Sequence, residues 1–394
     1  MNLNTKLNLE LDARKAEHLY RTRKILASAQ SVEPIIDGQK VLTFCSNDYL
    51  GLANHPEVIK SFKQAADNYG VGSGSAHLVS GHSLEHHLLE EELATFMGTE
   101  RALLFSTGYM ANLGVVSALC DRHSEIYEDK LNHASMLDAA LLSRAKRIRY
   151  PHLDIEFLKS QLSKSDNKNK LVMSDGVFSM DGDCLPLNTV AEMCEKNNAT
   201  LMVDDAHGIG VLGKKGRGTL EHFSLDATQV PIIVGTLGKA FGTAGAFVAG
   251  NEVLIETLIQ KSRSYIFTTA MPAAVAAATR TSLQLVEQET ERREKLLSLI
   301  RLFKKGANEL GLDLLESDTA IQPVVVGSSE KALCLSEKLL EKNILIGAIR
   351  PPTVPENTAR LRITFSATHS EEHVNKLLTV LEEISIQRHC GRTK

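Results

Sequence analysis

The sequence predicts an α/β fold, with a large domain on a mostly parallel sheet of seven strands and a smaller C-terminal α+β domain. From about residue 100, short apolar runs alternate with helix-length amphipathic segments, which is the rhythm of βαβ units. Runs such as Ile232-Ile-Val234 are apolar throughout, as in parallel strands covered on both faces. Polar residues follow several of these runs, at the strand ends where such sheets gather their functional sites.

The strands expected in the large domain are 102–105, 125–128, 147–150, 170–174, 201–204, 231–235 and 245–249. A helix signal over 270–279 and a charged stretch from Glu287 to Lys295 then predict a domain boundary. Beyond it, strands at 321–326, 344–349 and 359–365 should alternate with helices at 330–342 and 371–384.

The N-terminal residues predict a helix over 12–28 and an edge hairpin through 32–44, which we interpret as an arm over a partner subunit. The expected division is therefore an arm at 1–45, a large cofactor-binding domain at 46–290 and a C-terminal α+β domain at 291–394.

Composition excludes several function classes. The chain has 44 basic and 48 acidic residues and a net charge of −4, so it has no general attraction to nucleic acid or to anionic membranes. Its longest apolar stretches are shorter than the ~20 residues that cross a bilayer, and the polar N-terminus lacks a signal-peptide pattern, so we expect a cytoplasmic protein. Scattered cysteines without a Cys-x-x-Cys pair predict reduced thiols at Cys45, Cys120, Cys184, Cys194, Cys334 and Cys390.

The most informative residue is Lys239, which lies among small residues after an apolar strand. Such a lysine can form an imine with a cofactor aldehyde. Asp204, 35 residues earlier at the end of another strand, can keep a pyridine nitrogen protonated so that the ring accepts electrons. Asp205 is an alternative for this role, and a lone aspartate at a strand end is more often a turn or cap residue. Together the two positions imply pyridoxal 5'-phosphate.

Further residues suit the same cofactor. The segment Ser106–Asn112 follows a strand and opens a helix, so its backbone amides can bind the phosphate, with Gly108 permitting close approach and Tyr109 adding an amide. An ordinary helix cap is the alternative interpretation. Four more polar residues follow strands and could stack on the ring, reach it or contact the phosphate, although each could instead stabilise its loop: His133, Ser179, His207 and Thr236.

Two other patterns raise alternatives, a dinucleotide-binding turn and a metal site, which the surrounding sequence does not support. The glycines of Gly208-Ile-Gly-Val-Leu-Gly213 match a dinucleotide-binding turn, but Lys-Lys-Gly-Arg-Gly follows in place of an apolar helix, and no acid ends a second strand ~20 residues on. His82, His86 and Glu90 share a helix face, with His87 adjacent, so a metal site is conceivable. A polar helix face is the simpler interpretation, and we expect no metal.

Four motifs carry a resemblance to the α-oxoamine synthases: Cys45–Leu52, Asp175–Asp183, Val203–Gly208 and Thr236–Lys239. This family of fold-type-I pyridoxal phosphate enzymes joins an amino acid to an acyl thioester with loss of carbon dioxide. The resemblance, which extends through nearly the whole chain, implies a homodimer. It also implies Lys239 as the Schiff-base lysine, Asp204 as the pyridinium partner and His133 as the stacking residue. Ser179, His207 and Thr236 are implied as polar contacts, and Gly108 and Tyr109 as the phosphate turn.

The resemblance also implies substrate contacts. Arg362 suits a bidentate grip on an amino-acid carboxylate, Asn47 matches a substrate-facing position, and Arg21 and Thr353 match positions for the acyl substrate. Within the family, three C-terminal segments imply L-alanine and a pimeloyl thioester, carried on coenzyme A or on acyl carrier protein: Ala320–Pro323, Ala348–Pro355 and Ala359–Arg362.

Some positions depart from the family pattern. Ser75-Ala-His77 stands where Gly-Ser-Arg is common, His82 replaces Asn or Tyr, and Asp175 replaces Glu. These departures concern substrate details rather than the cofactor residues. The nearest alternative is a member that uses glycine with acetyl-CoA or succinyl-CoA. A non-catalytic cofactor-binding regulator and a nicotinamide dehydrogenase are alternatives from other classes.

Overall fold

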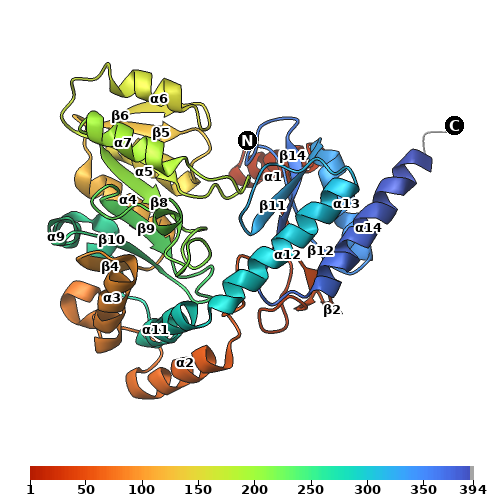
Figure 1. Cartoon of the computed structure of the whole chain (residues 1–394), viewed down its shortest axis with the longest axis horizontal. Helices are drawn as coiled ribbons and strands as arrows, with labels where there is room; N and C mark the ends of the chain where they lie inside the picture. The colour runs from red at the N-terminus through yellow and green to blue at the C-terminus, as the bar shows by residue number, and fades with distance from the viewer. Residues whose placement is uncertain (391–394) are drawn as a thin grey trace. The chain divides into compact units, whose positions relative to one another are not determined.

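The computed structural model describes residues 1–390 and forms two compact units (Figure 1). The larger unit comprises residues 47–179 and 183–294. The smaller unit comprises residues 1–46, 180–182 and the chain from 295 onward, so the N-terminal residues group with the C-terminal ones. The expected covering of a partner subunit by an N-terminal arm stays a prediction.

The larger unit is built on the predicted seven-stranded sheet, in the order β4-β10-β9-β8-β7-β5-β6. Strands β5 to β9 form a continuous parallel set, and only β10 runs antiparallel to its neighbours β9 and β4. This confirms the mostly parallel sheet. The strands are β4 (Arg101–Phe105), β5 (Glu125–Asp129), β6 (Lys146–Tyr150), β7 (Lys170–Asp175), β8 (Thr200–Asp204), β9 (Ile232–Thr236) and β10 (Ala246–Gly250).

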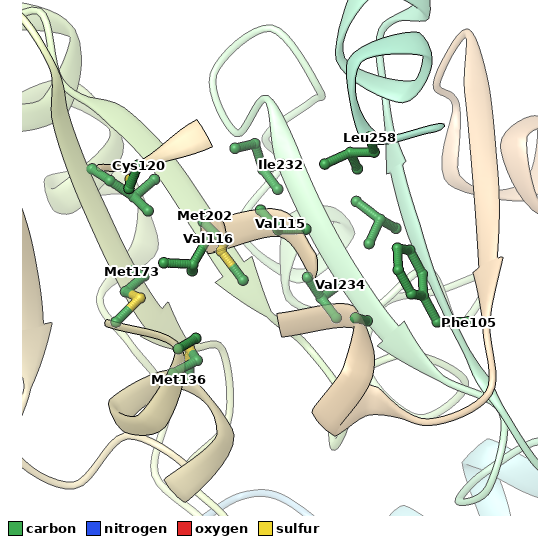
Figure 2. Packing of buried hydrophobic residues seen from close by; sticks show 14 of the residues in the cluster. Phe105, Val115, Val116, Cys120, Met136, Met173, Met202, Ile232, Val234 and Leu258 are labelled. Carbon is green, nitrogen blue, oxygen red and sulfur yellow. The ribbon is translucent and has the colours of Figure 1, made fainter. Parts of the chain in front are cut away.

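Both faces of this sheet are buried, which explains why its strands are apolar throughout. On one face, alternate strand residues such as Met173, Met202 and Val234 pack against Val116 of α4 (Gly108–Leu119) and Met136 of α5 (Ala134–Ser143) (Figure 2). The intervening strand residues, which point to the other face, are also buried: Val172, Val203, Ile233 and Phe247.

The remaining helices of this unit lie before β4, between successive strands or after β10. They are α2 (Pro56–Tyr69), the π-helix η1 (His77–Gly81), α3 (Leu84–Met97), α6 (Ile155–Leu162), α7 (Leu187–Lys196), α8 (Thr219–His222), α9 (Glu252–Lys261), α10 (Arg263–Ile266) and α11 (Ala273–Gln288). Helix α12 (Thr290–Glu309) then carries the chain into the smaller unit.

The smaller unit has a three-stranded antiparallel sheet in the order β11-β14-β13. Its elements are β11 (Ile321–Gly327), α13 (Ser329–Glu341), β12 (Ile344–Leu345), β13 (Gly347–Ile349), β14 (Ala359–Thr364) and α14 (Glu371–Cys390). The single strand expected over 344–349 is thus two strands, because β12 pairs instead with β3 (Leu42–Thr43). A hairpin of β1 (Ile35–Ile36) and β2 (Gln39–Lys40) lies in the predicted hairpin region.

The prediction of a helix over residues 12–28 is wrong. Helix α1 spans Leu3–Ala16, starting after Asn2, whose side chain accepts from the Thr5 amide at 2.9 Å. It stops before His18, which has a left-handed φ of 57°. The residues beyond join the hairpin, because the Ala27 amide donates to the Ile35 carbonyl at 2.8 Å. Hairpin pairing therefore replaces the second half of the expected helix.

Two other sequence expectations concern the described residues. No disulfide joins the described cysteines Cys45, Cys120, Cys184, Cys194 and Cys334, and the side chain of Cys390 lies outside the described part. Among the described helices, none has both the length and the apolar character needed to span a bilayer.

Candidate active site

The predicted cofactor residues of the larger unit lie at the carboxyl edge of its sheet. Gly108 and Tyr109 follow β4, and His133 follows β5. Because carboxyl ends of parallel strands meet at one edge, these residues are placed near the ones that follow the next strands. Those are Ser179 after β7, Asp204 and His207 at and after β8, and Thr236 and Lys239 at and after β9.

Lys239 heads a chain of hydrogen-bonding groups. Its Nζ lies 2.8 Å from Nε2 of His207, and Nδ1 of the same ring lies 2.6 Å from the hydroxyl of Tyr49. His207 and Tyr49 are buried, whereas Lys239 is half-buried. The tight turn after the lysine is held by a bond from the Gly242 amide to the Lys239 carbonyl at 2.8 Å. The lysine is therefore held at a fixed place beside a histidine that can exchange protons with it.

Asp204 is a buried acid whose two carboxylate oxygens both accept hydrogen bonds. Its Oδ2 accepts from the side-chain amide of Asn112 at 2.7 Å, and its Oδ1 accepts from the Ala206 amide at 3.1 Å. These two donors fix the direction of the carboxylate. An anionic carboxylate at the sheet edge is the group that could hold a protonated pyridine nitrogen.

The neighbouring Asp205 serves the loop rather than the sheet edge. Its carboxylate is fully buried and accepts from the Thr219 amide at 2.7 Å, and burial raises its pKa to about 8. A Cβ on Gly208 would lie 2.1 Å from Oδ1 of Asp205, and one on Gly218 would lie 1.9 Å from Oδ2. Two glycines of this segment thus make room for Asp205. The dinucleotide interpretation therefore loses its basis, and residues 208–218 form a loop instead of a helix.

His133 is oriented from two sides. Its backbone amide donates to Oδ2 of Asp175 at 2.7 Å, and its Nδ1 lies 2.7 Å from the Ser135 hydroxyl. Partial burial lowers the pKa of His133, while Asp204 opposes the shift and Lys239 adds to it. Hydrogen bonds also link the ring to Asp204, through the Ser135 hydroxyl and the side-chain amide of Asn112. It is therefore available to stack on a flat ring bound there.

Asp175 is a buried acid beside Asp204. The two residues are paired across β7 and β8, and Asp175 is almost fully buried. Burial and the Asp204 charge raise the pKa of Asp175 well above its ordinary value. Burial and the neighbouring charge therefore favour the protonated, neutral form of Asp175.

The start of α4 can hold an anion. The Thr107 hydroxyl caps the helix by accepting from the Met110 amide at 3.2 Å, and a Cβ on Gly108 would meet only open space. The hydroxyl of Tyr109 donates to Asp138. Thr236 contributes a hydroxyl that donates to the Gly245 carbonyl at 3.2 Å. The open space at Gly108, in the first turn of the helix, would allow a phosphate group to approach the helix-terminal amides.

The histidines proposed as an alternative metal site are placed differently from the expected helix face. Ring nitrogens of His77, His82 and His86 lie within 4.8 Å of one another. Glu90 is not part of this group, although its Oε2 lies 3.9 Å from Nε2 of His82. Both nitrogens of His86 are engaged, Nε2 with the Met271 carbonyl at 2.8 Å and Nδ1 with the Ser83 amide at 3.0 Å. His86 therefore serves to cap α3 and to tie it to the segment before α11.

The predicted substrate residues fall in both units. Asn47 begins the larger unit, and its Oδ1 accepts from the Tyr49 hydroxyl at 3.2 Å. In the smaller unit, Arg21 and Thr353 line one cavity of about 490 Å³, and Arg362 is a buried residue of β14. The same cavity also receives the cationic residues Arg14, Lys24 and Arg350. Its charge suits an anionic ligand.

Two functional candidates were missed by sequence reasoning. Tyr49 lies within the motif Cys45–Leu52, and Asn112 closes the segment Ser106–Asn112, so both motifs were noticed without these side chains. Their partners lie 158 and 92 residues further along the chain. The only sequence signal for Tyr49 and Asn112 was that each lies within a recognised motif.

Comparison with known proteins gives the family. Residues 39–381 match the aminotransferase class I and II family. An 8-amino-7-oxononanoate synthase of Cellvibrio japonicus is 58% identical over 97% of this chain and 96% of its own length. The enzyme of the same name from Thioalkalivibrio sulfidiphilus is 57% identical over 95% of this chain and 96% of its own length.

Solved structures agree with this assignment. A serine palmitoyltransferase of Sphingomonas wittichii superposes with a TM-score of 0.93 at 32% identity, covering 97% of this chain and 98% of its own. The 8-amino-7-oxononanoate synthase of Francisella tularensis has a TM-score of 0.78 at 31% identity, covering 89% and 99%. The fold is therefore that of fold-type-I pyridoxal phosphate transferases, and the chain belongs to the class I and II aminotransferase family and, within it, to the pyridoxal-phosphate-dependent 8-amino-7-oxononanoate synthases.

Proposed function

We propose that the protein condenses L-alanine with a pimeloyl thioester, giving 8-amino-7-oxononanoate, carbon dioxide and a free thiol in biotin biosynthesis. The observation that carries this proposal is the contact of Lys239 with His207 at the same sheet edge as the buried Asp204. The identity of 55–58% to enzymes named for this product supports the choice of substrates over glycine and acetyl-CoA.

The cofactor would be held by residues of the larger unit. Lys239 would link to it covalently, Asp204 would hold its ring nitrogen, and His133 would stack on the ring. When bound, pyridoxal phosphate supplies an electron sink for negative charge on the substrate α-carbon. The remaining contacts would come from Gly108, Tyr109, Ser179, His207 and Thr236.

The protein side chains would then manage protons and orientation. The Lys239 amine would take the α-proton of alanine and later return a proton to the same carbon. His207, 2.8 Å from this amine, would share that proton. Asp204, buried and held by two donors, would contact the ring nitrogen and keep that nitrogen protonated.

Substrate recognition would use the remaining predicted residues. Arg362 would grip the alanine carboxylate through two parallel hydrogen bonds until that group leaves as carbon dioxide. Asn47 would face the substrate, and Arg21 and Thr353 would contact the acyl group. The cationic cavity that contains Arg21 supports an acyl substrate that carries negative charge. Coenzyme A and acyl carrier protein are both carriers to be tested.

The assembly and the location of the protein are part of this proposal. We propose a homodimer in the cytoplasm, with no nucleic-acid or membrane partner. The net charge of −4 is consistent with the absence of those partners. Sedimentation of the purified protein at two concentrations would test the dimer, and a concentration-independent monomer would contradict it.

Thiol release tests the reaction. The wild type should release thiol with alanine plus pimeloyl thioester, on one or both carriers, far faster than with glycine plus acetyl-CoA. Lys239→Ala should keep the fold and lose both the covalent cofactor link and turnover. Lys196→Ala, at an exposed lysine paired with Glu192, is the matched control and should behave as the wild type. Normal turnover by Lys239→Ala would overturn the proposal.

A further inference from the structure

The chain of groups behind Lys239 continues past His207 and Tyr49 to Asn47. Successive contacts are Lys239 Nζ to His207 Nε2 at 2.8 Å, His207 Nδ1 to the Tyr49 hydroxyl at 2.6 Å, and that hydroxyl to Asn47 Oδ1 at 3.2 Å. Tyr49 and His207 are 1% and 6% exposed, so an unpaired donor or acceptor at either position would be costly.

The Tyr49 hydroxyl has one proton, and at least two acceptors lie within its reach. It can donate to the carbonyl oxygen of Asn47 or to Nδ1 of His207. A neutral imidazole carries a proton on one nitrogen and accepts on the other. The direction in which the Tyr49 hydroxyl points is therefore coupled to the tautomer of His207.

When Lys239 is an ammonium ion, every proton points away from it. Lys239 donates to Nε2 of His207, the ring donates from Nδ1 to the oxygen of Tyr49, and Tyr49 donates to Asn47. Each group is then paired, and the chain ends on an amide oxygen that can only accept.

When Lys239 is a neutral amine, the direction reverses. Tyr49 donates to Nδ1 of His207, and the ring donates from Nε2 to the lone pair of Lys239. The two arrangements differ by one proton, which leaves Lys239 for the surroundings, and by the exchange of an Nδ1 proton for an Nε2 proton. Tyr49 stays neutral in both.

We propose that the Tyr49 hydroxyl is a two-position switch that matches the tautomer of His207 to the charge of Lys239. Tyr49 is thus a positioning residue, which acts on the lysine through the histidine. This inference rests on the proposed function, in which Lys239 alternates between its charged and neutral states. A fixed donor in place of Tyr49 would favour one state and leave a buried group unpaired in the other.

The first test uses the cofactor-free protein, so it does not depend on turnover. The pH dependence of Lys239 labelling by acetic anhydride, followed by mass spectrometry, gives the midpoint at which the lysine becomes neutral. In Tyr49→Phe the charged arrangement loses the acceptor for Nδ1–H. Because hydrogen bonds in a charged chain are the stronger ones, the midpoint should fall by about one pH unit.

Nitrogen NMR of the His207 ring in the same samples should show the second signature. In the wild type, the proton should move from Nδ1 to Nε2 over the pH range in which Lys239 becomes neutral. In Tyr49→Phe this linkage should be lost. The matched control is Tyr150→Phe, which removes the hydroxyl of another fully buried tyrosine and should leave both measurements unchanged. A Tyr49→Phe protein that folds and has a wild-type midpoint and tautomer shift would overturn the switch.

The second test changes Asn47, the last group in the series of hydrogen bonds. Its two variants should shift the equilibrium between charged and neutral Lys239 in opposite directions. Asn47→Asp gives Tyr49 a stronger acceptor and should raise the midpoint, whereas Asn47→Leu removes the acceptor and should lower it. In a Tyr49→Phe background the Leu effect should vanish, and the Asp effect should shrink to the direct attraction between the two charges. Equal shifts with and without the Tyr49 hydroxyl would show that the switch does not exist. A wild-type protein that shows the expected midpoint and tautomer shifts but releases no thiol from alanine and pimeloyl thioester would instead contradict the proposed reaction.

Discussion

The side-chain amide of Asn112 donates to the carboxylate of Asp204 over 2.7 Å, and both residues are buried. The same nitrogen donates to the Ser135 hydroxyl at 2.8 Å, and that hydroxyl also contacts the His133 ring. Asn112 thus links the acid that would hold the cofactor ring nitrogen to the histidine that would stack on the ring. It lies on α4, the helix whose first turn would bind the phosphate.

Asn112→Ala should weaken cofactor binding, because Asp204 loses a donor that fixes the direction of its carboxylate. A hydrogen bond to a charged group contributes about 1.5–3 kcal/mol, so the dissociation constant should rise roughly 10- to 100-fold. Titration of the cofactor-free protein, followed by cofactor absorbance, measures this change. Asn197→Ala, which removes an asparagine bonded to a backbone carbonyl on α7, should bind normally. Equal affinities of Asn112→Ala and wild type would refute the role of the amide.

The carboxyl-edge residues could be predicted because they depend on local sequence. The alternation of strands and helices fixes where each strand ends, and parallel strands bring those ends together. His133, Asp204 and Lys239 could therefore be assigned to one site. Asn112 and Tyr49 could not, because their partners are distant in sequence and polar residues at such positions have many other uses. The N-terminal helix was misplaced because the pairing of Ala27 with Ile35 is not visible in helical periodicity.

Gly242→Ala should disturb the loop that carries Lys239. Gly242 has a φ of 66°, and an added Cβ would lie 2.3 Å from the backbone nitrogen of Ala53. Neither backbone can move freely there, so the loop must shift and both cofactor affinity and thermal stability should fall. Gly238→Ala is the matched control one residue before the lysine, since its Cβ would meet nothing closer than 3.6 Å. Scanning calorimetry and cofactor titration of both variants test this, and equal losses in the two would contradict the steric argument.

Asp181→Ala should strongly destabilise the smaller unit. Asp181 accepts from the guanidinium of Arg360, whose side chain is 4% exposed. Removing one partner leaves a buried charge without its counter-ion, which costs about 3–5 kcal/mol. Urea unfolding measures this loss.

The control for this ion pair lies in the same unit. Glu383→Ala breaks an exposed pair with Lys342, in which both side chains are about half exposed, so the free energy of unfolding should change by about 0–1 kcal/mol. Replacing both Asp181 and Arg360 by leucine and methionine should restore part of the stability lost in Asp181→Ala, because no charge is then left buried. A double variant less stable than the single one would be inconsistent with this account.

His152 should make stability depend on pH in the alkaline range. Burial disfavours its charged form, but hydrogen bonds to Asp129 at 3.1 Å and Asp183 at 2.8 Å outweigh burial and raise the pKa of His152 to about 10 from an ordinary 6.5. The folded protein therefore binds a proton more tightly than the unfolded chain. This contribution to stability is complete below pH 6.5 and is lost as the pH rises through 10.

His152→Gln should accordingly cost most at pH 6 and progressively less at pH 8 and 10. The difference in the free energy of unfolding between wild type and variant should be roughly 2 kcal/mol at pH 6, since the bonds lost involve charged partners. Urea unfolding at the three pH values gives this difference directly. His123→Gln, at an exposed histidine whose Nε2 accepts from the guanidinium of the neighbouring Arg122 at 3.1 Å, should give a small difference without this trend. A His152→Gln penalty that is constant or grows from pH 6 to pH 10 would mean that the imidazole is neutral in the folded protein, and that its two bonds to carboxylates are not those of a charged ring.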